Sequence, residues 1–172
     1  LAVQPALERL ACSPPAADAV RRLGLEPGFL YYPANTWAHK NHASLLRALA
    51  ELARAGIRPL LVCSGSPKEA QGELESLAAE LGLEGQVWFL GYLAIEDVAA
   101  LYAHAAALIF PSLFEGFGMP VLEAMRFGCP VACSRVTSLP EIAGEAALYF
   151  DPRDPADIAA QDVRDRIARA RQ

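Results

Sequence analysis

The chain has 172 residues, 53% of them hydrophobic, which is enough for one domain with a buried core and excludes an intrinsically disordered protein. Its 15 Lys and Arg residues against 20 Asp and Glu residues give a net charge of -5, so the composition offers no basic face for a nucleic acid. This balance does not exclude a small anionic ligand, since a diphosphate needs only one or two cations and some backbone amides.

The predicted elements form a repeating pattern from residue 29 onwards, in which short apolar runs alternate with amphipathic stretches. Before it, residues 1–28 contain Pro14 and Pro15 and are expected to form a connector with one short helix over 16–23. The apolar runs predict six strands: 29–32, 59–63, 86–90, 107–110, 130–134 and 147–150. The amphipathic stretches predict helices over 42–55, 68–81, 95–106 and 120–127, a short turn of helix over 139–143, and a helical tail from Asp154 with a solvated charged run over 162–166.

The strands show little alternation of polar and apolar residues, as expected of strands that are covered on both faces. With right-handed crossovers, their order predicts an α/β fold: a doubly wound, Rossmann-like parallel sheet of about six strands with helices on both faces. We expect residues 29–172 to form this single domain. In such a sheet, ligands bind outside the carboxyl ends of the strands, so the candidate site lies in the loops that lead into helices.

The loop after the fourth predicted strand carries the most informative pattern. Gly116 and Gly118 permit close backbone approach or a positive φ, and Pro120 suits the first position of the following helix. That helix directs its free amides and positive dipole end at the loop, which favours a phosphate. Glu115 and Glu123 can bracket a ligand rich in hydroxyl groups, because carboxylates accept hydrogen bonds from paired hydroxyls. Alternatively, the two glutamates only complement the helix dipole, which leaves the glycines unexplained.

The loop after the first predicted strand supplies a cation. Lys40 stands at the opening of the next helix and can meet a phosphate at the same edge of the sheet; the alternative is an ordinary solvated lysine. His39 and His42 are spaced i, i+3, but no third ligand accompanies them, so we expect surface polar groups and no metal site.

The chain has four cysteines, and no two of them form a C-x-x-C pair: Cys12, Cys63, Cys129 and Cys133. Three of the four lie in apolar stretches that are typical of strands. We expect all four to be buried free thiols in a reducing cytosol. No signal peptide opens the sequence, and its longest apolar stretch, residues 98–110, is too short to span a bilayer. Because the chain begins at Leu1 and stops at Gln172 inside a helical pattern, we expect a piece of a longer protein.

The segment PSLFEGFGMPVLEAM, residues 111–125, strongly resembles the E-x7-E segment of the retaining glycosyltransferases called family 4 (group 1), which have the two-domain GT-B fold. The similarity continues co-linearly over about residues 29–155, including the segments 89–92, 101–105, 128–131 and 138–147. The resemblance implies that the chain is the carboxyl-terminal, donor-binding half of such an enzyme. Its partners would be a nucleotide sugar and an amino-terminal, acceptor-binding domain that this chain lacks.

The resemblance also implies a role for each site residue. Glu123 would hold the ribose hydroxyls of the nucleotide, Glu115 would orient the hydroxyls of the transferred sugar, and Lys40 would bind the diphosphate. Gly65 would flank the base or ribose, and the segment 91–93 would meet the base mainly through its backbone, at Tyr92 and Leu93. The remaining donor-binding residues belong to the fourth loop and the helix start, where amides would face the sugar and phosphates: Gly116, Phe117, Gly118, Met119, Pro120, Val121 and Leu122.

One position departs from the pattern of the family. Many members carry an arginine on the diphosphate five residues before the lysine, and here Asn35 occupies that position. Thr36 or His39 would then donate hydrogen bonds in place of the cation. Lys40 and the helix amides would stabilise the leaving diphosphate electrostatically, with no obligatory metal and no cofactor beyond the substrate.

The resemblance implies a hexosyltransferase that acts on a glycan or a lipid-linked acceptor, with a GDP-sugar or UDP-sugar as donor. The loop around residues 39–41 is similar to that of mannosyltransferases of surface polysaccharide assembly, which favours GDP-mannose and leaves UDP-sugars open. Retention in the family is usually ascribed to same-face attack, so Glu115 is not assigned as a nucleophile.

Two alternatives stay open. One is a non-catalytic nucleotide-sugar-binding or assembly module of the same fold. The other is an epimerase or phosphorylase on the same scaffold, although such enzymes do not usually carry this loop with both Glu115 and Glu123 in place. We expect the full-length enzyme to be cytoplasmic or peripheral at the inner membrane face. The chain alone is expected to bind donor weakly and to transfer nothing.

Overall fold

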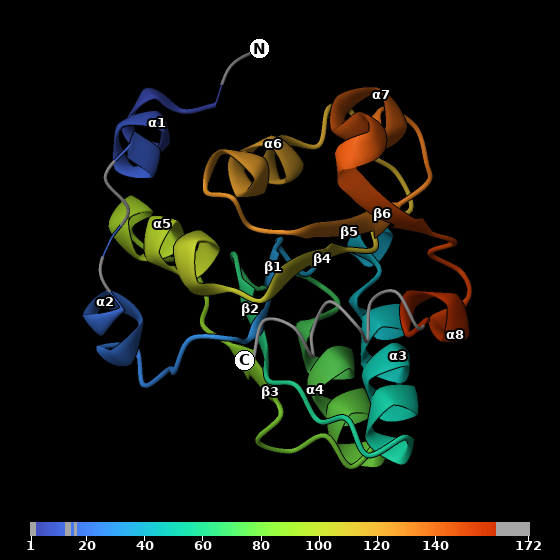
Figure 1. Ribbon diagram of the computed structural model, residues 1–172. Helices are drawn as coiled ribbons and strands as arrows, with labels where there is room; N and C mark the ends of the chain where they lie inside the picture. Colours follow the sequence, from blue (N-terminus) through green and yellow to red (C-terminus); the bar gives the residue numbers. More distant parts are fainter. Residues whose placement is uncertain (1–2, 13–14, 16, 161–172) are drawn as a thin grey trace.

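The computed structural model describes residues 3–12, 15 and 17–160, and its centre is a six-stranded parallel sheet (Figure 1). The strands lie in the order β3-β2-β1-β4-β5-β6. Each predicted strand is present, with its ends shifted by at most about two residues. The strands are β1 (Leu30–Pro33), β2 (Leu61–Ser64), β3 (Val87–Phe89), β4 (Ala107–Phe110), β5 (Val131–Ser134) and β6 (Ala147–Phe150). The chain changes its direction of winding between β1 and β4, which makes their carboxyl ends the switch point of the sheet.

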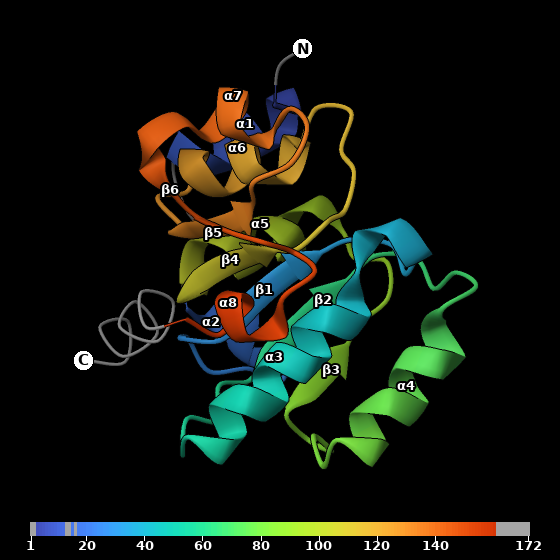
Figure 2. The ribbon, with the colours of Figure 1, turned by 90° about the vertical axis from the view of Figure 1, so that its right-hand side faces the viewer.

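Helices cover both faces of the sheet, as predicted for a Rossmann-like α/β fold. One face carries α3 (His42–Arg54), α4 (Gln71–Glu80) and α8 (Pro155–Ile158), which lie in front of the strands in Figure 2. The other face carries α5 (Ile95–His104) and α6 (Met119–Arg126), with α7 (Leu139–Ala143) packed beside α6. There are also two single turns of 3-10 helix, η1 (Ala38–Lys40) and η2 (Gly144–Ala146).

Two helices precede β1, where the sequence predicts one. The predicted helix over 16–23 is present as α2 (Asp18–Arg21), and α1 (Pro5–Cys12) is additional. Val3 and Leu7 pack with Ala99 of α5 in a small second cluster of buried residues. The residues of α1 do carry an amphipathic helical pattern, so this helix could have been predicted from the sequence; the interpretation of residues 1–28 as a connector with one helix overlooked it. Of the predicted helical tail, α8 is present, and the charged run over 162–166 lies outside the described residues.

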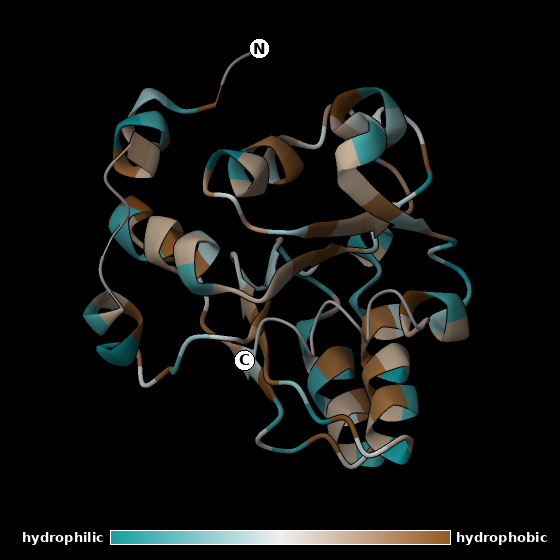
Figure 3. Ribbon diagram, viewed as in Figure 1, coloured by the Kyte–Doolittle hydropathy of each residue, from teal (hydrophilic) through white to brown (hydrophobic). Residues whose placement is uncertain are grey.

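The core consists of the strands and the inward faces of the helices. β2, β4 and β5 are buried along their whole length, because helices cover them on both sides. Figure 3 shows these apolar strands in brown between helices that carry teal, hydrophilic residues. In the described part of the chain, no helix has both the length and the apolar character needed to cross a membrane.

The cysteines are free thiols, as predicted. Cys63, Cys129 and Cys133 are buried, and burial raises the pKa of each thiol. Cys12 is exposed on α1, which corrects the expectation of four buried thiols. Cys129 lies in the turn before β5 and not in a strand.

Candidate functional site

The loops that follow β1 and β4 are tied together at the switch point of the sheet. The N–H of Leu113 donates a hydrogen bond to the carbonyl of His39 at 2.9 Å. The side-chain amide of Asn41 donates to the carbonyl of Pro111 at 3.0 Å. These contacts bring a loop rich in polar groups against the glycine-containing loop, although the two are far apart in the sequence.

Lys40 and Glu115 form an ion pair across this junction. The Nζ atom of Lys40 lies 2.5 Å from Oε1 of Glu115, and the two side chains are only 19% and 9% exposed. The hydroxyl of buried Tyr32 donates to the carbonyl of Lys40, and this hydrogen bond fixes the backbone of the lysine. The sequence pattern assigned the two residues to different groups of the ligand, and the structure shows that they also contact each other.

Glu115 is anchored on its other side by the loop after β5. Its N–H donates to Oγ1 of Thr137 at 3.2 Å, and its carbonyl accepts from the hydroxyl of Ser138 at 3.3 Å. Neither residue was predicted from the sequence to belong to the site. The available signal was that hydroxyl side chains follow β5 at the same edge of the sheet. Loops from three strands therefore determine the position of this carboxylate.

The residues after Glu115 present unused backbone donors at the start of α6. Gly118 is the N-cap residue with a φ of 77°, and the helix begins at Met119, so Pro120 is its second residue and offers no N–H. The N–H of Val121 donates to the carbonyl of Gly118 at 3.0 Å, which corrects the expectation that it faces a ligand. No hydrogen bond within the described residues uses four of the N–H groups here: those of Gly116, Phe117, Gly118 and Met119. Together with the helix dipole they favour an anion.

The side chains at the start of α6 mostly serve packing. Val121 is fully buried in the main core. Met119 and Leu122 are partly buried and pack against the small cluster that holds α1. The side chain of Leu122 is therefore used in packing, and the next residue, Glu123, carries the carboxylate that the sequence pattern singled out.

Glu123 lies in the second turn of α6 and accepts a hydrogen bond. The hydroxyl of Tyr102, from α5, donates to Oε2 of Glu123 at 2.8 Å. Burial raises the pKa of Glu123, and the hydrogen bond from Tyr102 opposes this change. Tyr102 was not predicted from the sequence to belong to the site. Its signal was a phenol within an apolar run, because a buried tyrosine hydroxyl usually needs a partner.

A hollow of about 320 Å³ lies beside Lys40, at the carboxyl ends of β1 and β2. Ser64 also lines it, and its Oγ lies 2.7 Å from the hydroxyl of buried Tyr31. The rings of Tyr31 and Tyr102 pack edge-on, with their centres 5.1 Å apart. Because Tyr102 donates to Glu123, a chain of contacts leads from the hollow to Glu123. Five of the predicted site residues line the hollow: Asn35, Lys40, Gly65, Tyr92 and Leu93.

The loops after β1 and β2 interlock through Asn35 and Thr36. Oδ1 of Asn35 accepts from the N–H of Ser66 at 2.7 Å, and Oγ1 of Thr36 accepts from the N–H of Lys68 at 2.6 Å. Asn35 lines the hollow, whereas Thr36 is 3% exposed and does not. Of the two residues expected to donate hydrogen bonds in place of the absent arginine, Thr36 is not placed to do so, because its side chain is enclosed between two loops, whereas His39 is exposed.

Gly65 has a steric reason to be glycine. Its φ is 133°, and a Cβ atom built on it would lie 2.6 Å from the carbonyl carbon of Ala34. Its N–H donates to the carbonyl of Gly91 at 2.8 Å, which links the loops after β2 and β3. Only a residue without a side chain allows these loops to form the wall of the hollow.

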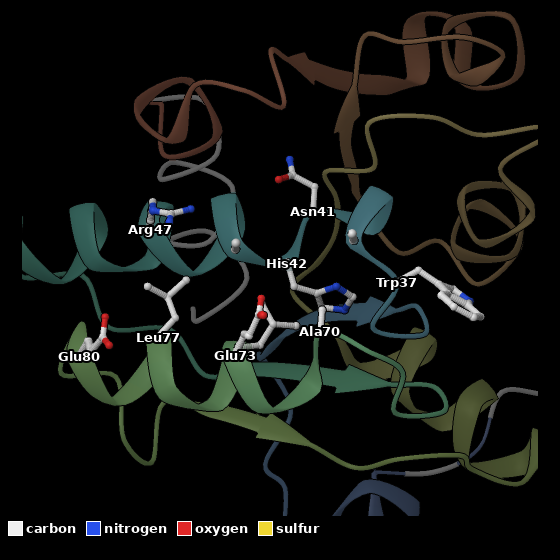
Figure 4. Close-up of a pocket in the computed structure, with 11 residues that line it drawn as sticks. Trp37, Asn41, His42, Arg47, Ala70, Glu73, Leu77 and Glu80 are labelled. Carbon is white, nitrogen blue, oxygen red and sulfur yellow. The ribbon is translucent and has the colours of Figure 1, made fainter.

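A second cavity, of about 370 Å³, opens between α3 and α4 and contains none of the predicted site residues (Figure 4). Trp37 lies at one end of it and Arg47 and Glu80 at the other, with His42 and Glu73 between them. No group of three or more His, Cys, Asp or Glu residues in the described part of the chain is placed to hold a metal ion.

His42 is buried at 3% exposure, which corrects the expectation of a surface histidine. Its ring packs on the ring of Tyr32 at 4.5 Å, and neither ring nitrogen has a hydrogen-bond partner among the described residues. Burial lowers the pKa of His42 to about 4. The imidazole is therefore neutral near pH 7. His39 is exposed, as expected.

The chain is similar in sequence to known glycosyltransferases. The family model described as "Glycosyl transferases group 1" matches residues 27–164. O-antigen chain mannosyltransferase B of Escherichia coli is 41% identical over 134 residues, which cover 77% of this chain and 35% of that protein. The chain thus spans about a third of the length of this curated relative.

Two solved structures share the fold. A glycosyltransferase from Rickettsia africae superposes with a TM-score of 0.82 at 16% identity, over 96% of this chain and 45% of that chain. Anabaena HepE, in complex with UDP and glucose, superposes with a TM-score of 0.73 at 22% identity, over 98% of this chain and 46% of that chain.

Proposed function

Because the chain belongs to the group 1 glycosyltransferase family, we propose that it is the carboxyl-terminal, nucleotide-sugar-binding half of a retaining GT-B enzyme of family 4. The observation that carries this proposal is the Lys40–Glu115 ion pair at the switch point, beside a hollow lined by five of the predicted site residues. The acceptor would bind mainly to a second domain. The identity of 41% to an O-antigen mannosyltransferase supports transfer of mannose to a glycan or lipid-linked acceptor.

The ion pair defines how the site would receive a diphosphate. Before a donor binds, Glu115 neutralises Lys40 at 2.5 Å. An entering diphosphate would replace Glu115 as the partner of Lys40, and the released carboxylate would accept hydrogen bonds from hydroxyls of the sugar. This exchange of partners would place the sugar between Glu115 and the free amides of the glycine-containing loop.

During transfer, the bond between the sugar and the diphosphate breaks and negative charge builds on the leaving group. Lys40 and the unused N–H groups of residues 116–119 would stabilise that charge, so the proposal includes no obligatory metal. Glu123 would accept the ribose hydroxyls, and the hollow at Gly65 and Tyr92 would hold the base. HepE binds UDP and glucose, which supports a nucleotide site on this fold and leaves the choice between GDP and UDP to experiment.

Calorimetric titration of the chain with GDP and with UDP tests these assignments. Lys40→Ala should weaken binding of the preferred nucleotide about tenfold, since it removes a charge-assisted contact. Glu123→Ala should also weaken binding, through the lost ribose contact. Glu115→Gln should strengthen binding several-fold, because it frees Lys40 from its anionic partner.

Lys68→Ala is the matched control. Lys68 is the second of the two lysines, and its Nζ lies 5.3 Å from the centre of the Trp37 ring, outside the hollow. This variant should bind like the wild type. Undiminished binding in both Lys40→Ala and Glu123→Ala would refute the site assignment.

A further inference from the structure

We propose that Tyr102 is a positioning residue that acts through Glu123 to make the site select ribose over deoxyribose in its nucleotide. This inference rests on the proposed function, which assigns the ribose to Glu123. It adds a residue that touches no ligand itself, because Tyr102 is 1% exposed.

The contact between the two residues determines which carboxylate oxygen is available. Tyr102 donates to Oε2 of Glu123 at 2.8 Å, and no other hydrogen bond within the described residues reaches that carboxylate. Oε1 is therefore left to accept from a ribose hydroxyl. Without the phenol, the carboxylate can rotate about its last torsion angles, and a single preferred geometry is lost.

Tyr102 can perform this role because its own ring is held in place. The ring of Tyr31 contacts it edge-on at 5.1 Å, and the ring of Phe127 stacks on it at 5.8 Å with an interplanar angle of 16°. Burial raises the pKa of Tyr102 well above its ordinary value, so the hydroxyl keeps its proton and acts as the donor. The carboxylate is thus oriented by a neutral, buried and preorganised group.

The experiment compares binding of GDP, 2′-deoxy-GDP and 3′-deoxy-GDP, or of the uridine compounds if the wild type prefers UDP. The variants are Tyr102→Phe, Glu123→Gln and the double variant, with Tyr149→Phe as the control. Tyr149 also carries a phenol that donates to a backbone carbonyl, that of Gly144, but it lies far along the chain on β6. The quantity of interest is the ratio of ribonucleotide to deoxynucleotide affinity.

We expect Tyr102→Phe to lower this ratio about fivefold, the size of one ordinary hydrogen bond, and to leave deoxynucleotide affinity nearly unchanged. Glu123→Gln should also lower the ratio, and adding Tyr102→Phe to it should have no further effect. Tyr149→Phe should behave like the wild type. Equal weakening of all nucleotides by Tyr102→Phe overturns the proposal, because that is the outcome of a merely structural role.

The pH dependence gives a second, independent readout. Glu123 must be ionised to accept two hydrogen bonds, so the ribose preference should disappear as the pH falls through the pKa of Glu123. Tyr102 lowers that pKa, and its removal should therefore move the loss to a higher pH. If the ribose preference of Tyr102→Phe disappears at the same pH as that of the wild type, the inference is contradicted. If only Glu123→Gln loses the ribose preference, the inference fails and the proposed function stands; if the wild type binds no nucleotide, both fail.

Discussion

At the scale of single residues, the structure changes the roles predicted from the sequence for several side chains. Lys40 and Glu115 are partners before any ligand binds, so the local charge of the site is not that of a free lysine. Thr36 is enclosed between loops and serves their packing. His42 belongs to the interior. The residue types were readable from the sequence, and their partners were not, because partners depend on loops from other strands.

Buried His42 should make the stability of the protein depend on pH. Its folded pKa of about 4 lies below that of an exposed histidine, about 6.5, so the unfolded chain takes up a proton first as the pH falls. Its contribution to stability is complete above about pH 6.5 and is lost progressively down to about pH 4, amounting to roughly 3 kcal/mol. Urea unfolding at pH 7 and at pH 4 measures this loss.

The His42→Leu variant removes the titrating ring and should lose about 3 kcal/mol less stability than the wild type between these two pH values. His39→Asn is the control, since it replaces an exposed histidine three residues away. Equal losses of stability in the wild type and His42→Leu would show that His42 does not titrate in this way.

At the scale of elements, the sequence predicted the strands and the main helices well, because apolar runs and helical spacing are local properties. It missed α1, which is short and is held by contacts with α5 and α6. It also could not predict how the loops interlock. The close approach of Gly65 to Ala34 is the clearest case, since the two residues belong to different strand-to-helix loops.

Gly65→Ala should destabilise the protein by about 3 kcal/mol, from backbone strain at positive φ together with a clash against Ala34. Gly82→Ala is the matched control: Gly82 also has a positive φ, of 66°, but nothing lies within 4 Å of an added Cβ. That variant should lose only the strain, about 1 kcal/mol. The free energies of unfolding in urea give both values, and equal losses would mean that the approach to Ala34 relaxes without cost.

At the scale of the whole molecule, the fold presents its candidate site at one edge of the sheet. The loops after β1, β2, β3 and β4 contribute to it, and residues of the first three of these loops line the hollow beside Lys40 together with Val98 of α5. The chain spans 35% of the E. coli mannosyltransferase. These observations fit a site that is completed by a second domain, as the proposed GT-B arrangement requires.

We therefore expect the chain alone to bind a nucleotide and to transfer no sugar. Incubation with GDP-mannose and with UDP-sugars, followed by measurement of released nucleotide, checks this expectation. The longer protein proposed above serves as the positive control. Turnover by the chain alone would contradict the prediction, whereas absence of turnover in the longer protein would favour the non-catalytic binding module.

The sequence by itself determined the fold class and the six strands, and it predicted the edge of the sheet where the candidate site lies, because these follow from local periodicity and from the topology of parallel sheets. Only the tertiary structure decided that Lys40 meets Glu115, 75 positions away, and that Tyr102 meets Glu123, 21 positions away. The physical reason is that these contacts depend on which strands are neighbours and on how helices pack against them, and no local pattern records that packing.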